Sequence, residues 1–167
     1  MKNNLLPLMV ACSLGAVTLS SLAQDGGVSY MHITGTVVEP ECVINNNQQI
    51  EVDFGEVLTT RVDGVNYETQ IRYSLSCSNL LRNTLKINLR GTPASFNGGL
   101  FMTDVAGLGI RVYDASKTAV IPNSGELQFT YAANNPPALY AVPVAQNAAA
   151  LPGGAFNGSA TMVLSYQ

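Results

Sequence analysis

The sequence predicts an all-β fold, a sandwich of antiparallel sheets, and three observations lead to this prediction. Short runs alternate apolar and polar residues, which is the two-residue period of a half-buried strand. Glycine, proline and asparagine separate these runs, as turns separate strands. After residue 23, no run carries the 3.6-residue apolar period of a helix.

The first 23 residues predict a secretory signal. Lys2 supplies a positive start, residues 5–22 are apolar or small almost throughout, and Ser21-Leu22-Ala23 forms a small-x-small cleavage pattern. We therefore expect the mature chain to begin near Gln24.

Two other interpretations of this segment are disfavoured. A membrane anchor is disfavoured because Pro7, Ser13 and Gly15 interrupt the run, and no later stretch reaches the roughly 20 apolar residues of a spanning helix. A lipoprotein modified at Cys12 is disfavoured because the apolar run continues about ten residues beyond that cysteine.

The remaining 144 residues or so are enough for one domain with its own core. Charged residues make up only 11% of the chain and the formal net charge is −3. This composition gives no cationic surface for nucleic acid. A surface with few charges suits a protein that works packed against partners.

Strands are predicted first at 33–38, ended by Pro40, and at 50–54, ended by Gly55. A third, at 70–77, places alternate residues on one apolar face: Ile71, Tyr73, Leu75 and Cys77. Leu85, Ile87 and Leu89 repeat the pattern until the turn at 91–93.

The second half continues in the same way. Strands are predicted at 108–113 and 127–131, and the turn signal at 134–137 separates the latter from a strand at 139–144. A glycine- and alanine-rich connection leads to a last strand at 156–167. About eight short strands in one domain favour an immunoglobulin-like sandwich, which hides the inward residues of both sheets.

The predicted mature chain contains two cysteines, Cys42 and Cys77. Because export leads to an oxidising compartment, we expect them to form a disulfide. A metal site is the alternative, but two cysteines and the single histidine, His32, do not enclose zinc. We expect no metal and no other cofactor.

The two ends of the predicted domain are complementary. In the last strand, Ala160, Met162, Leu164 and Tyr166 face one side and apolar or small residues occupy the other, so both faces are expected to be partly buried. We expect this strand to be an unpaired edge, which monomeric proteins avoid. The N-terminal segment at 29–37 alternates too, yet has nothing local to pair with.

Four motifs in order resemble those of chaperone–usher pilus subunits. Gly35 stands seven residues before Cys42, the first cysteine of the predicted mature chain, and Val52-Asp53-Phe54-Gly55 is similar to the next family strand. The run 108–113 is similar to the mid-domain strand, and 158–167 to the C-terminal motif with its penultimate tyrosine. The resemblance spans the whole mature chain and is nearest to minor tip or adaptor subunits of type 1 and P pili.

This resemblance implies an incomplete immunoglobulin-like sandwich that lacks its final strand and is completed by donor-strand complementation. The expected organisation is a signal peptide at 1–23, a donor arm at 24–37 and a pilin domain at 38–167. The expected partners are a periplasmic chaperone, an outer-membrane usher and neighbouring subunits. The expected location is the cell-surface fimbrium, reached by secretion through the periplasm.

The resemblance also assigns residues. The donor face of the arm would be formed by alternate residues: Ser29, Met31, Ile33, Gly35 and Val37. The strand that meets the chaperone and lines the acceptor groove would contribute Ala160, Met162, Leu164, Tyr166 and Gln167. Each assignment has a purely structural alternative. Gly35 could be a β-bulge glycine, the arm could be an ordinary first strand packed on its own domain, and Tyr166 could be a core or rim aromatic.

The sequence offers no convincing candidates for catalytic residues. His32 lies in an alternating strand and is a poor general base. Glu51 and Asp53 share one strand face, which we interpret as a solvated face rather than a catalytic pair. We therefore expect a structural fimbrial subunit and no enzyme. The alternatives are a carbohydrate-binding fimbrial adhesin and a major rod pilin.

Overall fold

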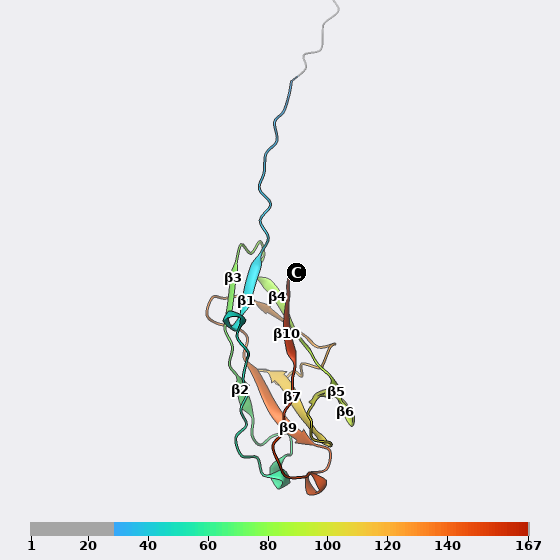
Figure 1. Ribbon diagram of the computed structural model, residues 1–167. Coiled ribbons are helices and arrows are strands. Elements are labelled where there is room, and N and C mark those ends of the chain that lie inside the picture. The colour runs from blue at the N-terminus through green and yellow to red at the C-terminus, as the bar shows by residue number, and fades with distance from the viewer. Residues whose placement is uncertain (1–28, 167) are drawn as a thin grey trace, which may run out of the picture. The chain divides into compact units, whose positions relative to one another are not determined.

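The computed structural model describes residues 29–166, and these form ten strands and three 3₁₀ turns (Figure 1). The predicted signal at 1–23, residues 24–28 of the predicted arm and Gln167 lie outside the described residues. The all-β prediction is confirmed. The strands are β1 (Glu41–Ile44), β2 (Thr69–Ile71), β3 (Leu75–Ser78), β4 (Thr84–Arg90), β5 (Pro93–Ala94), β6 (Asn97–Met102), β7 (Leu108–Asp114), β8 (Glu126–Thr130), β9 (Leu139–Ala145) and β10 (Thr161–Tyr166).

The strands form three antiparallel sheets. The largest has the order β2-β9-β7-β6-β5, the second has the order β10-β4-β8, and β1 pairs with β3. One buried cluster joins the two larger sheets, because Ile87 and Leu89 of β4 pack with Val112 of β7 and Leu139 of β9. The two sheets therefore pack face to face as a sandwich.

The small sheet carries the disulfide. Cys42 of β1 lies directly opposite Cys77 of β3 in the antiparallel register, and the two are bonded. This confirms the predicted pairing. The bond closes a loop with a sequence separation of 35, which on the chain-entropy account stabilises the fold by about 3.5 to 4 kcal/mol.

The predicted strands with strong alternation are confirmed in β4, β7, β8 and β9. In β4 the alternate residues Leu85, Ile87 and Leu89 are all buried, while Thr84 and Arg90 at its ends are exposed. Every second side chain of the strand enters the core, so the alternation of apolar and polar residues in the sequence matches the alternation of buried and more exposed residues in the structure.

Several predictions about strand bounds were wrong. The strand expected at 70–77 is two strands, since β2 ends at Ile71 and β3 begins at Leu75. The last strand is shorter than expected, starting at Thr161 rather than 156. β5 and β6 were not predicted, because Gly98 and Gly99 interrupt any alternation there.

The predictions of strands at 33–38 and 50–54 are also wrong, since neither segment is hydrogen-bonded into a sheet. The chain divides after Thr36 into two units, each described by itself. Residues 29–36 form no helix or strand, and the side chains of Met31 and Ile33 are 82% and 81% exposed. A strand requires hydrogen-bonded partners, and within the described residues neither segment has them.

Within residues 29–166 the helical elements are only three-residue 3₁₀ turns, at Asn45–Asn47, Thr59–Arg61 and Ala148–Ala150. No helix there has the length and apolar character to cross a membrane.

Candidate functional site

An open groove of about 1410 Å³ lies over the core of the unit that begins at Val37. Its floor is made of core side chains from the larger sheet and β4: Ile71, Leu89, Phe101, Leu108, Ile110, Val112 and Ala141. Two segments far apart in the sequence, 47–57 and 151–162, form its walls. Except for Ile110, these floor residues are buried, so the groove lies directly above the apolar interior.

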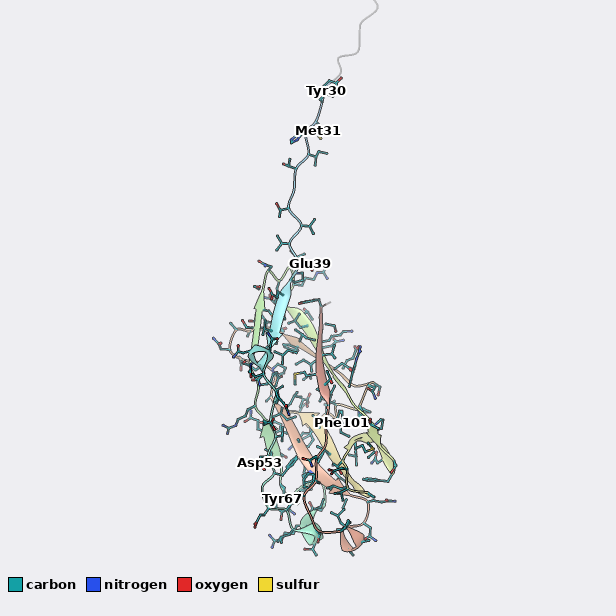
Figure 2. The ribbon with its side chains drawn as sticks, viewed as in Figure 1. Tyr30, Met31, Glu39, Asp53, Tyr67 and Phe101 are labelled. Atoms are coloured by element: carbon teal, nitrogen blue, oxygen red, sulfur yellow. A yellow bond between two sulfur atoms is a disulfide. The ribbon has the colours of Figure 1, made fainter. Side chains whose placement is uncertain are left out.

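The first wall alternates in burial without belonging to a sheet. Ile50, Val52 and Phe54 are half-buried and pack against the core cluster, whereas Glu51 and Asp53 are exposed. Figure 2 labels Asp53 on this wall and Phe101 on β6. Among the described residues, the backbone groups of 50–54 form no hydrogen bond with one another or with any other residue. This wall is a strand-like segment without a partner.

Three asparagines direct the chain into the first wall. Asn45, Asn46 and Asn47 have φ values of 46°, 52° and 60°, in the left-handed region that asparagine tolerates better than most residues. The side-chain nitrogen of Asn45 also donates to the carbonyl oxygens of Gln48 and Gln49 at 3.1 and 2.9 Å. This turn ends β1 and starts the unpaired segment.

The second wall is held at its start by Asp104. The Asp104 carboxylate accepts hydrogen bonds from the backbone and side-chain nitrogens of Asn157 at 2.7 and 3.1 Å, which lower the pKa of this carboxyl group. Gly158 then makes an isolated bridge with Thr103. A Cβ at Gly158 would lie 3.1 Å from the Met102 carbonyl oxygen, so glycine permits this close approach.

β10 continues the second wall and is an edge strand. It pairs with β4 over its whole length, from Thr161 opposite Arg90 to Tyr166 opposite Leu85, and with no other described strand. Its second edge is therefore open to a further strand.

The two walls meet at one point of the groove. The rings of Phe54 and Phe156 lie with their centroids 5.9 Å apart, at an interplanar angle of 33°. Both side chains line the groove. This aromatic contact joins segments that are about one hundred residues apart in the sequence.

The structure separates the predicted acceptor residues into three kinds. Ala160 and Met162 line the groove, and Leu164 packs against the core cluster. Tyr166 is 46% exposed, and its hydroxyl donates to the Pro40 carbonyl oxygen at 3.0 Å. Gln167 lies outside the described residues. Sequence reasoning missed that 47–57 forms the facing wall, although the alternation at 50–54 could have indicated it.

The predicted donor residues lie outside any sheet. Ser29, Met31, Ile33 and Gly35 lie in the first unit and Val37 begins the second, and all are exposed. A Cβ added at Gly35 would meet nothing within 4 Å.

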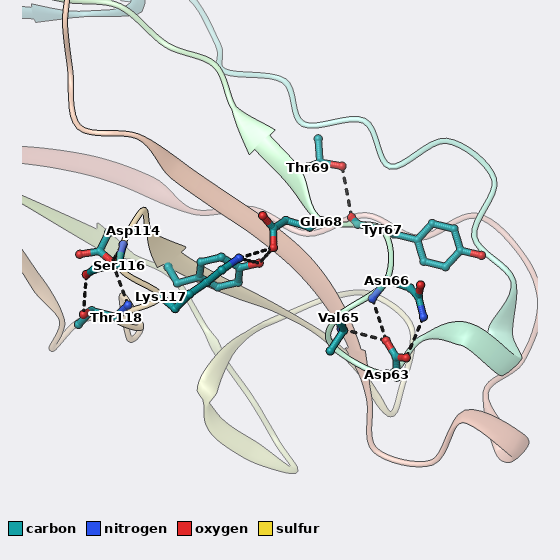
Figure 3. Close-up of polar contacts among 11 residues, drawn as sticks. Asp63, Val65, Asn66, Tyr67, Glu68, Thr69, Asp114, Ser116, Lys117 and Thr118 are labelled. Atoms are coloured by element: carbon teal, nitrogen blue, oxygen red, sulfur yellow. Dashed lines mark hydrogen bonds and ion pairs between the residues drawn. The ribbon is translucent and has the colours of Figure 1, made fainter.

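A polar cluster on the larger sheet offers a different kind of candidate (Figure 3). Lys117 forms an ion pair with Glu68 at 2.6 Å and lies 4.4 Å from the centroid of the Tyr113 ring, and the Tyr113 hydroxyl donates to the same carboxylate. The hydrogen bond from Lys117 lowers the pKa of Glu68, and the same contact raises the pKa of Lys117. Its charges satisfy one another, so this cluster fastens the segment before β2 to the end of β7.

Nothing in the described residues gathers three or more potential metal ligands. Burial raises the pKa of Tyr73, whose hydroxyl donates to the Pro137 carbonyl oxygen at 2.7 Å. The Tyr73 hydroxyl therefore has a hydrogen-bond partner and serves the structure. The groove, in contrast, has a wall at 50–54 whose backbone groups lack partners among the described residues.

Comparisons with known proteins agree with this geometry. The family described as Fimbrial protein matches residues 31–167. The uncharacterized fimbrial-like protein YfcR of Escherichia coli (strain K12) is 35% identical over 161 residues, which covers 95% of this chain and 91% of that protein. The fimbrial adapter PapF of Escherichia coli is 28% identical over 160 residues, covering 90% of this chain and 95% of PapF.

Solved structures show the same fold. The P pilus rod subunit PapA superposes with a TM-score of 0.60 at 21% identity, covering 83% of this chain and all of PapA, 100%. The P pilus adaptor subunit PapF gives a TM-score of 0.57 at 27% identity, covering 75% of this chain and 95% of that structure. The predicted sandwich with an open edge is thus confirmed as the fold of known pilus subunits.

Proposed function

The chain belongs to the fimbrial protein family, and from that premise we propose that it polymerises by donor-strand exchange as a minor or adaptor subunit. It is a structural subunit of the cell-surface fimbrium. Its work is binding rather than catalysis, and the groove is where that binding takes place.

One observation carries the proposal. A groove with an apolar floor lies between the unpaired backbone of 50–54 and the second wall, whose last residues, Thr161 and Met162, begin the open edge of β10. A strand laid between the walls would pair its main chain with both and place alternate side chains on the core. This is strand addition, in which main-chain hydrogen bonds supply affinity and alternate side chains supply specificity.

Apolar burial supplies part of the driving force for strand addition. Burying each large apolar side chain of a donor strand contributes about 1.5 to 3 kcal/mol, while ordering each residue of a flexible arm costs about 1 to 2 kcal/mol, so the main-chain hydrogen bonds to both walls are needed as well. These values are upper bounds for an arm that is already partly collapsed.

The proposed donor is the N-terminal arm at 24–37 of one subunit, entering the groove of the next. The exposed alternate side chains of Met31 and Ile33 would supply the apolar contacts, and Gly35 would allow close backbone approach. Val37 and Ser29 would extend the same face. A periplasmic chaperone would fill the groove first by pairing with β10, and the outer-membrane usher would be the place of exchange.

An adaptor position is supported by the likeness to PapF. The chain is 28% identical to the PapF adapter over nearly its full length, whereas its 21% identity to the rod subunit PapA supports only the fold. The proposed position is therefore between other components of a fibre rather than in its repeating rod.

The test is assembly with an arm deletion. The variant lacking 24–35 should fold with its chaperone and accept a neighbour's strand, but should fail to donate one. Because it can accept a strand but cannot donate one, fibres would contain this variant only as a terminal subunit. A deletion variant found inside a fibre, with a normal subunit beyond its missing arm, would refute the donor role. A Glu41→Gln variant, altered at an exposed position outside the groove, serves as the control and should assemble normally.

A further inference from the structure

We propose that the groove prefers a donor strand with lysine or arginine on its outward face over the arm of a second copy of this chain. The proposal rests on the function proposed above, because it specifies which strand the same groove accepts. The occupant is thus the arm of a different subunit that carries basic residues.

The charged residues along the groove are all acidic. Glu51, Asp53 and Glu56 line it, and none of the described lining residues is a lysine, arginine or histidine. All three acids belong to the first wall. The second wall contributes only uncharged residues, so the negative charge is concentrated along one side of the groove.

These carboxylates are placed to meet the side chains of an added strand. Because Ile50, Val52 and Phe54 turn toward the core, Glu51 and Asp53 lie on the solvent side of the wall. A donor strand paired with this wall would have its own outward side chains directly beside them. Residues opposite each other on neighbouring antiparallel strands have Cβ atoms only about 4.5 to 5.5 Å apart.

The carboxylates are also free to interact. The two ion pairs among the described residues, Lys86–Glu126 and Lys117–Glu68, lie elsewhere. Asp53 accepts one hydrogen bond, from the Gly55 backbone nitrogen at 2.8 Å, and Glu51 accepts none from the described residues. An arriving cation would therefore compete with solvent rather than with an internal partner.

The chain's own arm lacks the matching charge. Residues 24–40 contain no lysine or arginine, and the acids Asp25 and Glu39 flank the alternating segment. Its outward positions carry Tyr30, His32, Thr34 and Thr36. A second copy would thus gain none of the attraction that a basic arm gains. Charge of this kind acts on partner choice and on the rate of encounter more than on total affinity.

The experiment measures binding of synthetic strands to the full chain. Three peptides share one alternating apolar face and differ only at two outward positions, which hold lysine, threonine or glutamate. A fourth peptide copies residues 28–39 of this chain. Dissociation constants and association rates are measured at about 50 mM and about 1 M salt, because exposed charge pairs are screened at the higher concentration.

The lysine peptide should bind on the order of three- to tenfold more tightly than the threonine peptide at low salt, as two favourable cross-strand pairs would give. The glutamate peptide and the copy of the chain's own arm should bind no better than the threonine peptide. The preference should fall below about twofold at high salt.

Variants locate the effect. In a neutral double variant, Glu51→Gln with Asp53→Asn, most of the preference should be lost, because Glu56 is the only lining acid left, while the new amide oxygen can still accept from the Gly55 nitrogen. In Glu51→Lys with Asp53→Lys it should reverse toward the glutamate peptide. The control Glu41→Gln removes an exposed carboxylate of β1 that does not line the groove, and should keep the preference.

The outcomes separate the two proposals. If the threonine peptide binds but the lysine peptide shows no advantage, or keeps its advantage in the neutral double variant, charge selection is wrong and strand acceptance stands. If no peptide binds or stabilises the chain, the proposed function itself is wrong.

Discussion

Phe54 and Phe156 meet across the groove, with ring centroids 5.9 Å apart, and so tie its two walls together. Each ring also lies against the groove's interior. The groove is thus open along its length but joined at this contact, and the joint depends on two residues about one hundred positions apart in the sequence.

The first prediction concerns this pair. Replacing either phenylalanine with alanine should destabilise the fold, and the two losses should not add, with a coupling of about 0.5 to 1.5 kcal/mol. Urea unfolding of the full chain and its variants gives the double-mutant cycle. Combining Phe54→Ala with Leu81→Ala, at a residue that is 96% exposed, is the control and should be additive. A coupling near zero for the aromatic pair would mean that the walls are independent.

The second prediction concerns the disulfide between β1 and β3. Replacing both Cys42 and Cys77 with alanine should cost about 2 to 5 kcal/mol of unfolding free energy, because the unfolded chain regains the freedom of the closed loop. Thermal unfolding with and without a reducing agent provides the same comparison in the unmodified chain. Equal melting temperatures in the two conditions would show that the bond contributes little.

The third prediction concerns β10. Leu164→Lys together with Tyr166→Lys places charges against the core and removes the Tyr166–Pro40 hydrogen bond, so chaperone binding should be lost and the subunit degraded in the periplasm. Tyr166→Phe is the matched control: it loses only the exposed hydroxyl contact and should accumulate nearly as the parent does. Normal accumulation of the double-lysine variant without chaperone would mean that the sandwich is complete by itself.

The fourth prediction concerns acid. Hydrogen bonds lower the pKa of four carboxyl groups in the folded chain, those of Glu68, Asp63, Asp104 and Asp114. A group with a lowered folded pKa stabilises the fold above its unfolded pKa, and this stability is lost as pH falls through the folded value. The unfolded values are 4.5 for Glu68 and 3.8 for the aspartates, so the melting temperature should fall steadily below about pH 4.5.

Single variants test this assignment. Asp104→Asn removes one titrating carboxylate beside Asn157. The melting temperature of this variant should therefore fall less steeply as the pH decreases below about 4.5. Leu81→Ala, at an exposed position without a titrating group, should leave this pH dependence unchanged. If the melting temperature of the Asp104 variant depends on pH as the parent's does, the acid sensitivity belongs to other groups.

The sequence predicted the sheets best where burial and hydrogen bonding coincide. In β4, Leu85 and Ile87 are fully buried and the strand is paired on both sides, so alternation reported both properties at once. At 50–54 the alternation was equally clear, and the burial it implies is present. The ladder is absent, because alternation measures which side chains face the core and says nothing of whether a neighbouring strand exists.

The site was predicted in part for the same reason. The apolar pattern of β10 indicated an edge, and Met162 and Leu164 do contact the groove or core. The facing wall came from residues about one hundred positions away, and only the topology brings them to the same groove. Tyr166 was expected on the acceptor strand, with a core or rim aromatic as the alternative, and its position at the end of the strand leaves it half exposed.

Amide hydrogen exchange measures whether a strand from a neighbour fills the groove between 50–54 and β10. In the assembled fibre, alternate backbone amides of 50–54 should exchange at least about a hundredfold more slowly than in the isolated full chain, because they gain hydrogen-bonded partners. Amides of the exposed loop at 79–83 should not change. Unchanged exchange at 50–54 in fibres, with protection appearing elsewhere, would show that no strand pairs with this wall.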